Sequence, residues 1–92
     1  MSSGDTTQET LFEFPCDFPL KVFGHAQPGF AQAIAEIVLR HAPGFDPATI
    51  EMRSSSGAKY LSLTCTLRAE SRQQLDALYR ELCAHPMVKM AL

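Results

Sequence analysis

The sequence has no excess of positive charge and no long apolar segment near its start. It contains 8 Lys and Arg residues against 10 Asp and Glu residues, which gives a formal net charge of −2 at pH 7. Proteins that bind nucleic acid neutralise phosphates with clustered Lys and Arg. Residues 1–10 are acidic and rich in Ser and Thr, unlike a signal peptide or a membrane anchor. We therefore expect a cytoplasmic protein that binds neither nucleic acid nor membranes.

Residue types that carry chemistry are also sparse or badly spaced. The three cysteines, Cys16, Cys65 and Cys83, are far apart, and none belongs to a CxxC pair or stands near a His at metal-ligand spacing. The chain has no Asn, and residues 24–29 contain no Arg, so a phosphate site of the acylphosphatase kind is excluded. We expect Cys65 to be buried and Cys16 to be the accessible thiol. The sequence predicts no catalytic residue, no metal and no cofactor, and hence no enzyme.

The length of the chain allows a single folded domain. A chain of 92 residues, of which 46% are hydrophobic, is long enough to form one hydrophobic core and too short for two. Residues 1–10 have too little apolar content to offset the entropy cost of ordering them. We expect a flexible N-terminal tail at 1–10 and one domain at 11–92.

Periodicity of the apolar residues predicts two helices and four strands. Alternation at every second residue is typical of a half-buried strand, and spacing of three and four residues is typical of a helix. Ser71 and Gln74 have the spacing of a capping box at the start of the second helix. The expected elements are a strand at 17–24, a helix at 30–41, a strand at 49–53, a strand at 60–68, a helix from Ser71 to before Pro86, and a strand at 87–92.

This order is α+β and predicts a ferredoxin-like βαββαβ sandwich. Two helices, each with one apolar stripe, can bury these stripes against one face of a four-stranded antiparallel sheet with strand order 4-1-3-2. The opposite sheet face is then uncovered. The residues expected there are Lys21, Phe23, Thr49, Glu51, Arg53, Tyr60, Ser62, Thr64, Thr66, Met87 and Lys89.

Two regions of this fold are candidate sites. Lys21, Phe23, Tyr60 and Met87 form a candidate interaction surface on the uncovered face, because exposed apolar clusters mark contact surfaces. The alternative is ordinary surface, covered by the stems of long charged side chains.

The second region is the loop at residues 24–29. Its candidate ligand-binding residues are Gly24, His25, Gln27 and Gly29, because the loop leads into a helix N-terminus whose free N–H groups suit a carboxylate or phosphate. The alternative is a solvated loop, since no partner for His25 stands at a plausible spacing.

Several segments together resemble a known family. They are residues 12–15 (Phe-Glu-Phe-Pro), 20–24 (Leu-Lys-Val-Phe-Gly), 40–43 (Arg-His-Ala-Pro) and 54–60 (Ser-Ser-Ser-Gly-Ala-Lys-Tyr). In this order and spacing the chain resembles the YbeD-like family of small bacterial proteins of unknown function over residues 11–92. The resemblance implies a ferredoxin-like fold related to ACT regulatory domains, which bind small effectors between paired domains. It also implies a link to lipoate metabolism, through neighbouring genes.

Three functions follow as hypotheses. The first is a small regulatory or interaction domain that pairs with itself or with another protein. The second is a domain that senses a small ligand, such as an amino acid or another acid, with the loop at 24–29. An enzyme is the third and has the least support, because no catalytic group is recognised and fold resemblance alone does not establish activity.

Overall fold

The computed structural model describes residues 14–92. The predicted tail at 1–10 lies outside the described residues. The elements follow the order β1 (Cys16–His25), α2 (Phe30–His41), η1 (Pro47–Thr49), β2 (Glu51–Ser54), η2 (Ser56–Ala58), β3 (Tyr60–Ala69), α3 (Arg72–Ala84) and β4 (Val88–Ala91). Apart from the two short 3₁₀ turns, this is the predicted βαββαβ order.

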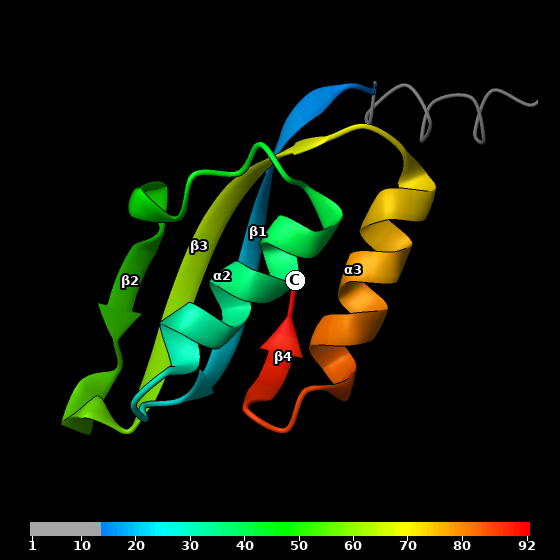
Figure 1. The fold of residues 1–92 in the computed structure, drawn as a ribbon. Helices are drawn as coiled ribbons and strands as arrows, with labels where there is room; N and C mark the ends of the chain where they lie inside the picture. Colours follow the sequence, from blue (N-terminus) through cyan, green and yellow to red (C-terminus); the bar gives the residue numbers. More distant parts are fainter. Residues whose placement is uncertain (1–13) are drawn as a thin grey trace, which may run out of the picture.

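The four strands form one antiparallel sheet in the order β2-β3-β1-β4, as Figure 1 shows. This is the order predicted for a ferredoxin-like fold. The helices α2 and α3 lie side by side and cover one face of the sheet, while β2 and β4 are its two edges (Figure 1).

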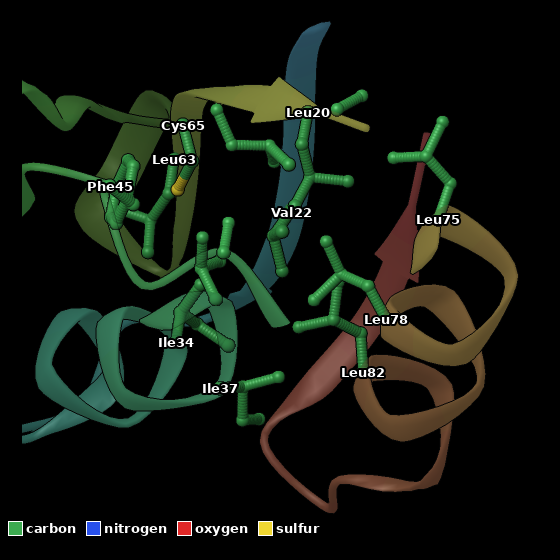
Figure 2. Close-up of a cluster of buried hydrophobic side chains, with 14 of the residues drawn as sticks. Leu20, Val22, Ile34, Ile37, Phe45, Leu63, Cys65, Leu75, Leu78 and Leu82 are labelled. Carbon is green, nitrogen blue, oxygen red and sulfur yellow. The ribbon is translucent and has the colours of Figure 1, made fainter. Parts of the chain in front are cut away.

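The core lies between the helices and the covered face of the sheet (Figure 2). On β1, Leu20 and Val22 are fully buried, and they lie opposite Cys65 and Leu63 of β3. Burying one such aliphatic side chain stabilises the fold by about 1.5–3 kcal/mol. The helices contribute the buried residues Phe30, Ile34, Ile37, Val38, Leu75, Leu78 and Leu82.

The start of α3 confirms the helix cap at Ser71. Its hydroxyl oxygen accepts a hydrogen bond from the Gln74 backbone N–H at 3.1 Å. The Gln74 side chain does not complete the box at Ser71, because its Oε1 accepts from the backbone N–H of Glu70 instead. Its Nε2 donates to the carbonyl oxygen of His41 at 2.7 Å. Gln74 therefore also ties the start of α3 to the end of α2.

The prediction that Thr49 lies in a strand is wrong. Thr49 belongs to the turn η1, and β2 begins at Glu51. Asp46 holds this turn, because its carboxylate accepts from Ala48 N at 3.0 Å and its carbonyl accepts from Thr49 Oγ1 at 2.7 Å. A local hydrogen bond of this kind competes with the strand ladder.

The predicted alternation of β4 is also wrong, because the β1–β4 pairing contains a bulge. Phe23 of β1 pairs with Met90, but Gly24 pairs with Val88, so Lys89 is an extra residue. An extra residue reverses the side-chain phase of the strand that follows it. Met90 therefore lies on the uncovered face rather than on the helix-covered face.

Candidate interaction surface

The sheet face that residues 14–92 leave uncovered, opposite α2 and α3, is built by alternate residues of each strand, and we call it the open face. Directly opposed residues of antiparallel strands point to the same side. On β1 and β3 the opposed pairs are Lys21 with Thr64, Phe23 with Ser62, and His25 with Tyr60. On β2, Glu51 and Arg53 lie opposite Thr64 and Ser62. The open face thus extends across all four strands once β4 is added.

Apolar side chains on the open face extend from the end of β3 across β1 to the edge strand β4, and we call them the apolar cluster. Phe23 of β1 is half-buried, and its partner on β4 is Met90, which is 51% exposed. Leu92 is 59% exposed and continues the ladder, because it exchanges two backbone hydrogen bonds of 3.0 and 2.7 Å with Lys21. Tyr60 is 43% exposed at the end of β3. Within residues 14–92, three of the four large exposed apolar side chains therefore lie on this face.

The aromatic ring of Tyr60 contacts the imidazole of His25. The two ring centroids are 4.9 Å apart, and the planes are tilted by 33°. In the adjacent residues, the backbone N–H of Ala26 donates to the carbonyl oxygen of Lys59 at 2.8 Å, and this hydrogen bond extends the β1–β3 pairing by one residue on each strand. His25 and Tyr60 therefore lie together at one corner of the open face.

Three of the four residues predicted for the interaction surface lie on the open face, and Met87 does not. Met87 precedes β4, is half-buried and packs against the core. The residues that the pattern missed are Met90 and Leu92. The available signal was Gly24, because a glycine inside a strand often marks a bulge or a close backbone approach.

Exposed charges surround the apolar cluster. Lys21 and Arg53 on the open face are exposed, as are Lys89 in the bulge and Glu51 at the edge. Among the described residues, the ion pair of this face joins Arg68 to Asp17 at 3.5 Å, at the opposite end of β1 from His25. The cluster therefore has more cationic than anionic neighbours on its rim.

The four residues of the predicted ligand loop do not face a common point. Gly24 is buried within β1, whereas His25 stacks on Tyr60 at the open face. Gln27 is exposed, and its carbonyl accepts from the Phe30 N–H at 3.3 Å. Gly29 precedes α2 with a φ of 85°, which favours glycine, and no side chain of residues 14–92 caps the helix there. Ligand binding at this loop stays a prediction.

The cysteines differ strongly in environment. Cys65 is fully buried in β3, and burial raises the pKa of its thiol to about 11. Cys16 is half-buried and Cys83 is exposed, so the prediction that Cys16 is the accessible thiol is wrong. Within residues 14–92, no group of three or more His, Cys, Asp or Glu side chains is placed to hold a metal ion.

A polar cluster joins the end of α2 to α3. Glu81 of α3 accepts hydrogen bonds from Arg40 with one carboxylate oxygen and from His41 with the other, the latter at 2.7 Å. These two hydrogen bonds, with Arg40 the larger contributor, lower the pKa of the Glu81 carboxyl. The cluster lies on the helix side and does not contact the open face.

Neither α2 nor α3, nor any other helix formed by residues 14–92, has the length and apolar character required to span a membrane.

Comparison with known proteins places these features in a family. Residues 9–92 match the family described as "Protein of unknown function (DUF493)". The chain is 58% identical to a UPF0250 protein of Bordetella pertussis over 92% of its own length and 93% of that relative. It is 56% identical to a UPF0250 protein of Nitrosomonas europaea, with 94% and 99% of the two chains covered. The chain therefore belongs to the DUF493 family of uncharacterised small bacterial proteins, the family expected from its YbeD-like resemblance.

Proposed function

We propose that this chain is a small regulatory or protein-interaction domain without catalytic activity, and that its partner protein binds the open face. The observation that carries the proposal is the apolar cluster of Phe23, Tyr60, Met90 and Leu92 on the sheet face opposite α2 and α3. Clusters of exposed apolar side chains with a polar rim mark protein contact sites.

The rim indicates the chemistry of the partner. Lys21, Arg53 and Lys89 surround the cluster, and Glu51 is the acidic residue among them. Electrostatic complementarity favours a partner whose own apolar patch is bordered by Asp and Glu side chains. The proposed setting is the bacterial cytoplasm. A role in lipoate metabolism and an ACT-like regulatory role rest on the family resemblance alone.

Site-specific photocrosslinking in cells tests this proposal. A photoreactive residue at position 60 or 90 lies on the open face, while one at position 73, exposed on α3, is the control. We expect both open-face positions to crosslink to the same protein and position 73 not to do so. Equal crosslinking from the control position would contradict the proposal.

Binding of the purified partner then provides the quantitative test. Lys21→Glu places an acidic group on the cationic rim and should weaken binding at least about tenfold, since each 1.4 kcal/mol corresponds to a factor of ten. The matched control is Arg80→Glu, which makes the same charge change at an exposed position of α3. If both variants bind equally well, the open face is not the binding site.

A further inference from the structure

The outer edge of β2 carries backbone groups that no described residue binds. β2 pairs with β3 on one side only and is the first strand of the sheet, as Figure 1 shows. The backbone N–H of Ser55 donates to the carbonyl of Tyr60. This hydrogen bond identifies which residues of β2 direct their backbone groups toward β3. Because antiparallel partners exchange hydrogen bonds at every second residue, Glu51 and Arg53 bond toward β3. The N–H and C=O groups of Met52 point outward.

An apolar groove lies beside this edge, on the helix-covered side of the sheet. It has a volume of about 480 Å³ and runs between α2, η1 and β2. Its apolar lining includes Ala35 and Leu39 of α2, together with Ile50 and Met52. Met52 is 54% exposed and is the one large exposed apolar side chain among residues 14–92 that does not lie on the open face. A strand added to this edge would cover Met52.

The charges on β2 are arranged symmetrically around Met52. Glu51 precedes it and Arg53 follows it, and both side chains lie on the open face. Neither residue makes an ion pair within residues 14–92. A strand with this charge order is complementary to an antiparallel copy of itself.

We propose that a second copy of this chain pairs its β2 antiparallel to the first, about a two-fold axis at Met52. The outward N–H and C=O groups of Met52 then bond to those of Met52 in the second copy. Glu51 faces Arg53 of the second copy, and Arg53 faces its Glu51. These are non-hydrogen-bonded positions, where opposed side chains lie closest. A single symmetric interface thus pairs Glu51 with Arg53 twice and covers both Met52 side chains.

The charge order is the reason for choosing a second copy over a strand of another protein. An open edge accepts any strand with free backbone groups. Only a strand with an anion and a cation two residues apart, in this order, places opposite charges at both positions. The dimer joins the two open faces into one continuous surface, so it goes beyond the proposed function without depending on it.

Analytical ultracentrifugation of the full chain at low ionic strength tests the dimer. We expect wild type to dimerise in a concentration-dependent manner. Glu51→Arg alone and Arg53→Glu alone place like charges in both contacts, so each should raise the dimer dissociation constant at least about tenfold. The charge change Arg80→Glu on α3 is the control and should have no effect. A wild-type chain that stays monomeric at millimolar concentration would overturn the proposal.

Mixing the two single variants gives a second, independent test. In the mixed pair each contact again joins a cation with an anion, so a dimer with one copy of each variant should form, detectable by native mass spectrometry. The double variant Glu51→Arg, Arg53→Glu should likewise dimerise as wild type does. Formation of the mixed dimer would also show that the single variants are folded. Absence of the mixed dimer would overturn the proposal. The variant Lys21→Glu, which tests partner binding at the open face, should leave dimerisation unchanged.

Discussion

A β carbon on Gly24 would lie 2.7 Å from the ring of Phe30, the first residue of α2. It would also collide with the carbonyl oxygen of Met87. Gly24 therefore allows three segments to approach one another: the end of β1, the start of α2 and the turn before β4. The same close approach accompanies the bulge that turns Met90 to the open face.

Replacing Gly24 by Ala should destabilise the fold. The added methyl group meets both an aromatic ring and a backbone oxygen, and overpacking of this kind costs about 1–3 kcal/mol. Urea denaturation measures the loss in the free energy of unfolding. Gly44→Ala is the matched control, because a β carbon there meets nothing within 4 Å. Equal stability of the two variants would show that the bulge region relaxes to accept the methyl group.

The reversed phase of β4 predicts opposite effects at two methionines. Met87 packs against the core, so Met87→Ala should cost about 1–2 kcal/mol, below the range for a fully buried Met. Met90 lies exposed on the open face, so Met90→Ala should change stability by less than about 0.5 kcal/mol. Thermal or urea unfolding measures both. The alternation predicted from sequence alone requires the reverse order of effects.

The three thiols should react at different rates with an alkylating reagent. Cys83 is exposed and should react first, followed by the half-buried Cys16. Burial raises the pKa of Cys65 to about 11, so only roughly one part in a thousand is thiolate at pH 8, and the reagent also lacks access. Cys65 should therefore be labelled only after unfolding. Mass spectrometry of native and urea-treated protein identifies the labelled sites, and native labelling of Cys65 would contradict its burial.

The Glu81 cluster predicts a stability difference that disappears in acid. Hydrogen bonds from Arg40 and His41 lower the pKa of Glu81 below its ordinary 4.5 in the folded state. The folded carboxyl therefore binds fewer protons than the unfolded one, so its contribution is present above pH 4.5 and is lost as pH falls through the lowered pKa.

Glu81→Gln removes this contribution and should lower the melting temperature at pH 6 by a small amount, because the carboxylate is partly exposed. The difference from wild type should shrink below pH 4.5. High salt is the control, since it screens an exposed ion pair. A difference that stays constant down to pH 2 would mean that packing of the Glu81 side chain, and not its charge, is responsible.

Local patterns were sufficient to predict most of the fold. The alternation over residues 60–68 and the spacing of apolar residues over 30–41 coincide with β3 and α2, because each segment has one face to bury. The cap at Ser71 was also predictable, since it depends on two residues in the same turn. The element order then restricted the topology to the observed sheet.

The candidate site was predictable only in part. Lys21, Phe23 and Tyr60 were placed on the open face because β1 and β3 are regular over their whole length. Met90 and Leu92 were not, because the register of β4 depends on its contact with Gly24 and not on its own sequence. The groove beside Met52 was likewise unpredictable, since it is formed by α2, η1 and β2 together.

The sequence by itself thus determined the family, the order of the elements and the face that each long strand buries. The tertiary structure decided where the strands meet: the bulge opposite Gly24, the turn that replaces the start of β2, and the free edge with Glu51 and Arg53 on either side of Met52. The physical reason is that burial patterns are local in the chain, whereas register, edges and grooves depend on contacts between segments that are distant in sequence.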